Sequence, residues 1–134
     1  MNVEAIAWVA ATLFGLLALF QVALALGAPL GAYVYGGRIA LDDGRLPTKW
    51  RVASAAAALI LLGFAWVILA RAGVIGTSLD ETLLLVLSWM VVAYMALNTA
   101  GNLTGKTNIE RYVFGGITMV LVVLCAIVAA AGPA

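Results

Sequence analysis

The side chains best suited to chemistry in this chain are a few amides and guanidinium groups that border long apolar stretches. Three amides lie near the end of such a stretch, namely Gln21, Asn98 and Asn102. Two guanidinium groups, those of Arg51 and Arg111, lie where another stretch begins. Amides donate and accept hydrogen bonds, and a guanidinium group forks onto an oxyanion. This combination favours recognition of an anion or a lipid headgroup.

Most catalytic and metal chemistry is not available to this sequence. It has no histidine and one cysteine, Cys125, so it lacks a Ser–His pair, a CxxC motif and a histidine-containing metal site. The segment GNLTGK (residues 101–106) resembles part of a phosphate-binding loop, but the full spacing is missing, so we interpret it as a loop with a helix cap at Gly101 or Gly105. We predict no catalytic residues, no metal and no cofactor. A net charge of +1 gives no indication of a nucleic-acid partner.

The elements that position these groups are four apolar stretches. The chain has 134 residues, 66% hydrophobic and 10% charged, far from the balance of a soluble domain. A helix needs about 20 apolar residues to cross a membrane. Four segments qualify, at about 5–26, 52–70, 82–100 and 112–132, joined first by an irregular or kinked segment at 27–49. We predict an all-α polytopic membrane protein, one transmembrane domain over 1–134 built as an antiparallel four-helix bundle.

Basic residues predict the orientation of this bundle. The loops at 27–51 and 101–111 contain all but one of the lysines and arginines, and Arg71 is the exception. Basic loops remain in the cytoplasm. We therefore expect integration into the cytoplasmic (inner) membrane, with both loops cytoplasmic and both termini outside. Acids that open a helix, such as Glu110, are interpreted as complements to the helix dipole.

Depth counting then brings the polar groups together at the cytoplasmic leaflet. Polar residues inside a membrane are costly and often functional. One interpretation is a pocket or vestibule open to the cytoplasm, and the other is that the groups cap helix ends and bond one another. The candidate ligand-binding residues are Gln21, Tyr33, Arg51, Asn98, Asn102 and Arg111. A second candidate site is an apolar cavity in the membrane core, with Trp89 and Tyr94 in its wall. The competing interpretation of these two aromatics is packing within the bundle.

The uncharged stretch GAPLGAYVYGG (residues 27–37) follows the first span directly. Pro29 removes a helical hydrogen bond, so the helix should end or bend near Gly27. Unsatisfied amides are costly in hydrocarbon, so we expect the stretch to fold back against the helix ends, with Tyr33 and Tyr35 at headgroup level. The alternative is a kinked, longer helix. If the protein binds a small molecule, this stretch is the expected lid or wall.

The motifs QVALALGAPLGAYVYGG and NLTGKTNIERYVFGG carry a loose resemblance to small bacterial four-helix integral membrane proteins. The resemblance covers most of the chain. It implies the four-helix fold and no particular activity, because no activity is known for that group.

We therefore expect a structural, accessory or ligand-binding membrane protein without recognisable catalytic chemistry. Membrane lipid is the expected partner, together with a homo-oligomer or a larger membrane complex. One alternative is a small transporter or channel with a cytoplasm-facing polar vestibule. The other is a membrane enzyme acting on a lipid-like substrate, with Gln21, Asn98, Asn102 and Arg111 binding its headgroup.

Overall fold

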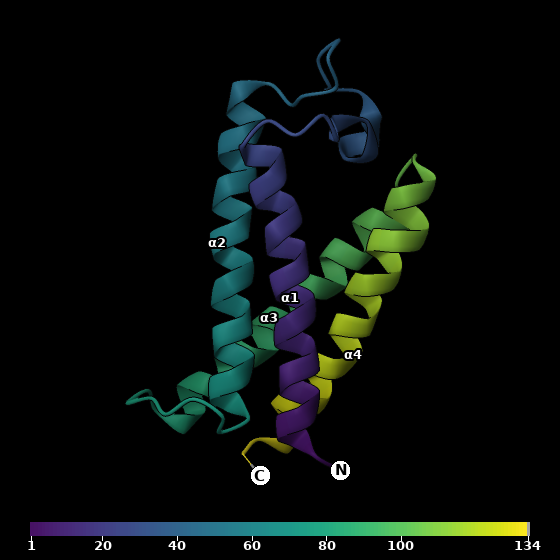
Figure 1. Cartoon of the computed structure of the whole chain (residues 1–134). Helices are drawn as coiled ribbons and strands as arrows, with labels where there is room; N and C mark the ends of the chain where they lie inside the picture. Colours follow the sequence, from purple (N-terminus) through teal and green to yellow (C-terminus); the bar gives the residue numbers. More distant parts are fainter. Residues whose placement is uncertain (134) are drawn as a thin grey trace.

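The computed structural model describes residues 1–133, which form four long helices and no strand. These are α1 (Val3–Ala25), α2 (Thr48–Arg71), α3 (Glu81–Leu103) and α4 (Gly115–Ala131), and a π-helical turn, η3 (Ile109–Phe114), leads into α4 (Figure 1). With η3 counted into the fourth, all four helices are long and apolar enough to cross a membrane. The predicted all-α four-helix fold is confirmed.

The helix boundaries differ from the predicted ones at the ends that carry polar residues. Helix α2 begins at Thr48, directly after Pro47, so its first turn includes charged residues that hydropathy excluded. Helix α3 continues through Gly101 to Leu103, with Thr104 as its C-cap, so the predicted cap at Gly101 is wrong. Polar residues at a helix end lie outside the apolar run but still form helical hydrogen bonds.

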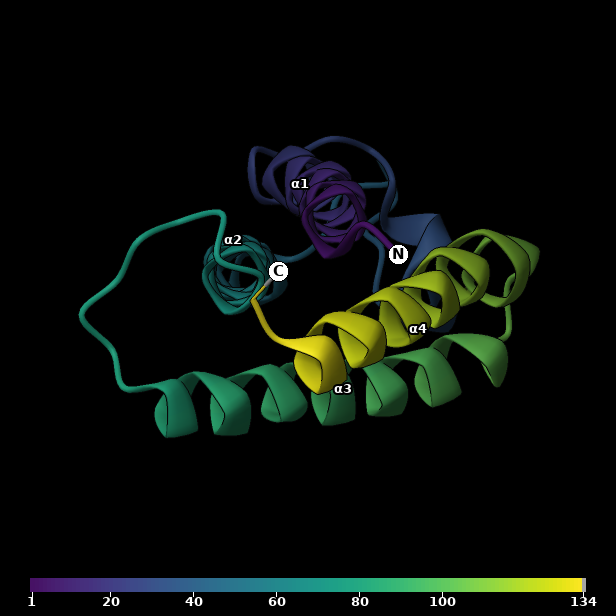
Figure 2. The same cartoon turned by 90° about the horizontal axis from the view of Figure 1, so that it is seen from below.

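The helices form two antiparallel hairpins, α1 with α2 and α3 with α4. The α3–α4 hairpin is steeply inclined to the first, and α4 diverges from α1 toward the top of Figure 1 (Figures 1 and 2). Small residues occupy much of the shared core, including Ala7, Ala10, Ala18, Ala58 and Ala65. Small side chains let helix backbones approach closely in lipid, where packing rather than water exclusion drives association.

The two ends of the bundle differ in charge. The arginine-rich end is formed by the α1–α2 and α3–α4 connections, and the terminal end holds both termini and the α2–α3 connection. At the arginine-rich end, the Nε–H of Arg51 donates to the carbonyl of Ala25 at 3.0 Å, and that of Arg45 donates to Gly27 at 3.1 Å. The first bond satisfies a carbonyl left unpaired at the end of α1, and the second holds the residue that follows its C-cap, Leu26.

Arg71, the exception in the charge pattern, has the same structural role at the terminal end. Its Nε and Nη2 donate to the carbonyl of Ala129 at 3.2 and 2.8 Å, in the last turn of α4. A cation at the C-terminus of a helix also interacts favourably with the helix dipole. The position of Arg71 therefore follows from helix capping.

The 27–37 segment leaves the helical path as soon as α1 ends. Gly27 has a φ of +97°, which an L-residue rarely adopts, and two short 3₁₀ turns follow, η1 (Gly31–Tyr33) and η2 (Tyr35–Gly37). The N–H of Gly31 donates to the carbonyl of Gly44 at 2.8 Å and fixes the segment to its return path. The predicted helix end near Gly27 is confirmed, and the alternative of a longer kinked helix is wrong.

Candidate functional site

A cavity lies between the two hairpins at the arginine-rich end. It has a volume of about 580 Å³, within the range of about 300–1,000 Å³ typical of small-molecule sites. All four helices and residues of the 27–37 segment contribute to its wall. The apolar part of the wall includes Leu17, Phe20, Leu24, Leu61, Met95 and Phe114.

Three predicted amides meet in this cavity. Gln21 contributes from α1, whereas Asn98 and Asn102 contribute from the last turns of α3. The Nδ2 of Asn102 donates to the Oδ1 of Asn98 at 2.9 Å. The Oε1 of Gln21 is buried and has no hydrogen-bond partner within residues 1–133. A buried acceptor without a donor is costly, and a ligand donor would satisfy this oxygen once the Gln21 side chain turns toward the cavity that the residue lines.

Three other predicted residues lie away from the cavity wall. Arg51 caps α1, and the Nε–H of Arg111 donates to the carbonyl of Gly105 at 2.9 Å, just beyond the end of α3. The phenol ring of Tyr33 is exposed on η1. The competing interpretation of the sequence, that polar groups cap helix ends and bond one another, therefore describes Arg51 and Arg111, and it also describes the mutual bond of Asn98 and Asn102.

The two predicted aromatic residues of α3, Trp89 and Tyr94, lie in different places. Tyr94 lines the cavity and meets the ring of Phe64 edge-on, with centroids 5.0 Å apart. Trp89 is exposed on the outer surface of the helix and does not line the cavity. Ser88, in the same part of α3, donates a hydrogen bond to the carbonyl of Leu85 in its own helix.

Glu110 lies in the first turn of the fourth helix, as the sequence predicts, but it also makes contacts that the sequence analysis did not identify. Its carboxylate is buried and lines the cavity. Oε2 accepts bonds from the N–H and Oγ1–H of Thr107, and the N–H of Glu110 donates back to Thr107 Oγ1. This reciprocal pattern is a capping box at the start of the fourth helix. The spacing Thr-x-x-Glu at 107–110 is the sequence signal that could have revealed it.

The same carboxylate fastens the 27–37 segment over the cavity. Oε1 of Glu110 accepts a hydrogen bond of 2.9 Å from the backbone N–H of Gly36, 74 residues away in sequence. Val34, Tyr35 and Gly36 consequently form part of the cavity wall. The segment thus occupies the position expected of a lid or wall.

Tyr35 is held in an unusual backbone conformation at the edge of this wall. Its φ of +51° is left-handed, which is uncommon for a non-glycine residue. Its ring packs against that of Trp50, with centroids 4.8 Å apart, and the ammonium of Lys49 lies 5.4 Å from the centre of the same indole. Burial, and secondarily the nearby phenol of Tyr94, raises the pKa of Tyr35, so its phenol stays neutral.

Two basic side chains that were not predicted as site residues line the cavity. These are Arg38, just after η2, and Lys106, between α3 and η3. Both pass close to Gly36, because a Cβ added there would lie 3.5 Å from Arg38 Nε and 3.8 Å from Lys106 Cδ. They therefore bring positive charge to the polar end of the cavity.

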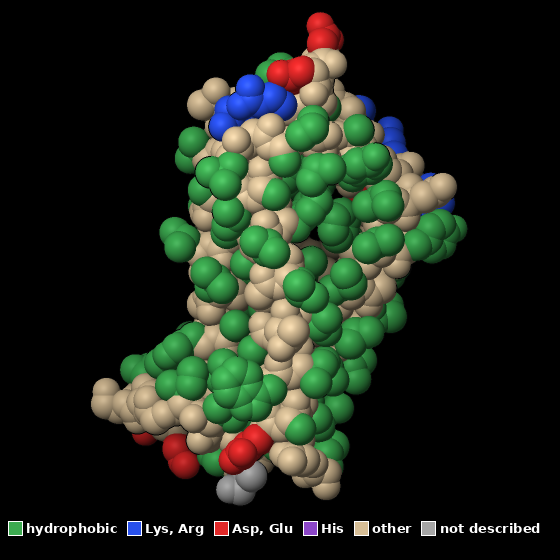
Figure 3. All heavy atoms as spheres, in the orientation of Figure 1, with side chains coloured by type: hydrophobic (Ala, Val, Ile, Leu, Met, Phe, Trp, Pro, Cys, Tyr) green, Lys and Arg blue, Asp and Glu red, His purple; other side chains and the backbone are tan. Residues whose placement is uncertain are grey.

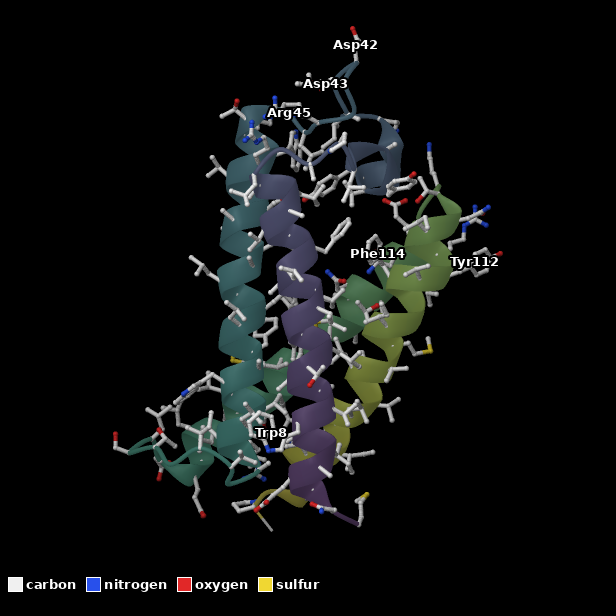
Figure 4. All side chains as sticks on the ribbon, viewed as in Figure 1. Trp8, Asp42, Asp43, Arg45, Tyr112 and Phe114 are labelled. Carbon is white, nitrogen blue, oxygen red and sulfur yellow. The ribbon has the colours of Figure 1, made fainter. Side chains whose placement is uncertain are left out.

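The apolar surface of the molecule has a hollow beside the cavity. Figure 3 shows this hollow between α1 and α4, bordered by hydrophobic side chains. Phe20 of α1 and Phe114 of η3 meet across the two hairpins, with ring centroids 4.9 Å apart, and Figure 4 shows Phe114 directed into the space between them. The cavity is therefore bounded by two aromatic rings on the face that lipid would cover.

The arrangement offers hydrogen bonding, positive charge and apolar contact to a ligand. Within residues 1–133 there is no group of three or more Cys, Asp or Glu residues that could hold a metal ion. Comparisons with protein-family models, with curated proteins and with solved structures found no match to this chain.

Proposed function

We propose that this chain is an integral membrane protein that binds one small amphipathic molecule in the cavity between its hairpins and does not transform it. The observation that carries the proposal is the unpartnered Gln21 Oε1 in a cavity whose wall combines apolar side chains with other polar and charged groups. Ligand sites typically combine apolar lining with a few convergent polar groups. A hydrogen-bond donor on the ligand would satisfy the oxygen that the protein leaves unpaired.

Binding is favoured over conduction by the composition of the core between the cavity and the terminal end. The residues there are apolar and fully buried, among them Phe14, Ile68, Leu121, Cys125 and Val128. A pore would need polar or hydrated lining along its length. This apolar core therefore closes the cavity toward the terminal end.

The proposal can be tested by filling the cavity with a larger side chain. Ala57 of α2 lines the cavity, and Ala57→Trp is expected to abolish most of the copurifying ligand because the indole occupies its space. Native mass spectrometry of gently extracted protein would detect the ligand as a mass adduct that is lost. The neighbouring Ala56 is exposed on the helix surface, so Ala56→Trp is the matched control. Equal adducts in both variants, or none in the unmodified protein, would contradict the binding function.

We also infer that the protein lies in the cytoplasmic membrane with its arginine-rich end in the cytoplasm. Six of the seven basic residues lie at that end, and such loops are retained on the cytoplasmic side. The acidic tip Asp42–Asp43 projects from that end beyond the helices (Figure 4), whereas Ser78 lies exposed in the α2–α3 connection. These two positions therefore report on opposite sides of the membrane.

Cysteine labelling in intact cells tests this orientation. In a Cys125→Ala background, an impermeant maleimide added from outside is expected to label Ser78→Cys and not Asp42→Cys. Permeabilising the cells should make both positions react, which controls for expression and thiol access. Labelling of Asp42→Cys from outside intact cells would reverse the proposed topology.

A further inference from the structure

We propose that the ligand is an anionic lipid with a hydroxyl group close to its anion, the chemistry of a phosphoglycerol headgroup. This inference rests on the proposed binding function and adds the class of molecule that is bound. Four features of the cavity support it: free positive charge, an engaged carboxylate, an unpaired acceptor and an apolar side facing the membrane.

The positive charge at the cavity is not used within the protein. The chain has seven basic side chains. Five of them are already engaged within the protein: four arginines donate to backbone carbonyls, and Lys49 lies over Trp50. The side chains of Arg38 and Lys106 make no hydrogen bond or ion pair within residues 1–133, and both line the cavity. An anion is the ligand group that two such cations attract, because charge-assisted hydrogen bonds are stronger than neutral ones.

Glu110, the carboxylate residue of the cavity wall, does not cancel the attraction of the two cations for an anion. Glu110 offers its oxygens to the N–H of Gly36 and to Thr107, so its charge is already stabilised by donors of the protein. Arg38, Lys106 and Glu110 together give the wall two positive charges and one negative charge. The wall is therefore net positive and favours an anionic head over a zwitterionic or neutral one.

The requirement for a hydroxyl group comes from Gln21. Its Oε1 accepts hydrogen bonds but cannot pair with an anionic oxygen, which is also an acceptor. Gln21 and the two cations belong to the same cavity. A headgroup that carries both an anion and a hydroxyl group can satisfy both, whereas a simple phosphodiester leaves the amide oxygen unpaired.

The apolar side indicates that the ligand comes from the membrane. The hollow between α1 and α4 lies on the hydrophobic surface (Figure 3). Phe20 of α1 and Phe114 of η3 line the cavity, with ring centroids 4.9 Å apart. A lipid whose head lies near Arg38 and Lys106 would direct its chains toward this face. A free phosphate or glycerol phosphate would leave the aromatic wall without a partner.

The test compares probes that separate these contributions. Delipidated protein is incubated in detergent with equal concentrations of phosphatidylglycerol, phosphatidylmethanol, phosphatidylcholine or glycerol 3-phosphate, and retention is measured by native mass spectrometry. Phosphatidylglycerol is expected to be retained about tenfold more than phosphatidylcholine, the size of effect produced by one or two charge-assisted bonds. Phosphatidylmethanol, which is anionic without a hydroxyl group, should fall between them, and glycerol 3-phosphate should not be retained.

Variants assign the preference to individual side chains. The double substitution Arg38→Gln with Lys106→Gln is expected to lower retention of phosphatidylglycerol to that of phosphatidylcholine. Lys49→Gln removes a cation from the same end outside the cavity wall and should leave retention unchanged. Gln21→Leu should remove the difference between phosphatidylglycerol and phosphatidylmethanol while keeping the preference for anions.

The outcomes separate this inference from the proposed function. Equal retention of all three lipids, or an equal loss in Lys49→Gln, would overturn the anionic class while the effect of Ala57→Trp on copurifying ligand still supports binding. Retention of glycerol 3-phosphate at the level of the lipids would overturn the membrane origin. If Ala57→Trp also changes nothing, the binding function itself is wrong.

Discussion

Replacing Glu110 by alanine is expected to release the 27–37 segment from the helices and to lower the free energy of unfolding by about 3 kcal/mol. The carboxylate accepts three hydrogen bonds, from the N–H of Gly36 and from the N–H and hydroxyl of Thr107. Alanine removes all three acceptors at once. The start of the fourth helix then loses its capping box, and the segment over the cavity loses this cross-chain bond.

Hydrogen exchange measures these two losses separately. Faster exchange is expected in peptides that cover Gly36 and in peptides that cover Thr107, with little change in the middle of α2. Glu110→Gln keeps one carbonyl oxygen, and glutamine is also favoured at the third position of a capping box, so an intermediate effect is expected. Glu4→Ala removes an exposed acid from the first turn of α1 and serves as the control for loss of charge. Unchanged exchange at Gly36 in Glu110→Ala would show that this bond does not hold the segment.

Much of the fold could be predicted from the sequence because membrane crossing imposes a length on apolar helices. Counting residues along antiparallel helices also gives depth, and depth brought Gln21, Asn98 and Asn102 to the same end of the bundle. The structure places all three in one cavity wall. Depth depends only on position along each helix, so it needs no knowledge of how the helices pack.

Depth along a helix does not reveal whether a side chain faces the cavity or another part of the protein. Arg51 and Arg111 lie at the right depth for a ligand, but both donate to backbone carbonyls at helix ends. Arg38 and Lys106 lie in connections without apolar periodicity, and the fold of these connections decides that they line the cavity. Side chains in irregular segments are placed by tertiary contacts that no local pattern records.

Glu110 makes one set of contacts that the sequence could predict and one contact that it could not. Its bonds to Thr107 span three residues and could be predicted from the spacing Thr-x-x-Glu. Its bond to Gly36 spans 74 residues and depends on the backbone of the 27–37 segment, which has left-handed conformations at Tyr35, Gly36 and Gly37. A sequence rich in glycine permits such conformations without specifying which one forms.

Gly37 combines a left-handed φ with a close backbone neighbour, and Gly37→Ala is the second substitution with a large expected effect. Its φ of +74° is left-handed, and a Cβ would lie 2.9 Å from the carbonyl oxygen of Ala32, a backbone atom that cannot rotate away. The left-handed conformation alone costs an L-residue about 1–2 kcal/mol. We expect a loss of about 2 kcal/mol or more in the free energy of unfolding, measured by chemical denaturation in detergent micelles.

Gly63→Ala provides the matched control because the same chemical change meets no obstacle there. Gly63 lies inside α2, and no atom outside its own helix backbone lies within 4 Å of an added Cβ. Alanine is favoured over glycine in a helix by up to about 1 kcal/mol, so this variant should be as stable as the parent or more stable. Opposite signs are therefore expected for the two variants. If Gly37→Ala is as stable as Gly63→Ala, the 27–37 segment has an alternative path over the cavity.

Gly37→Ala should also retain less of the bound ligand, because Gly37 ends the turn that presents the N–H of Gly36 to Glu110.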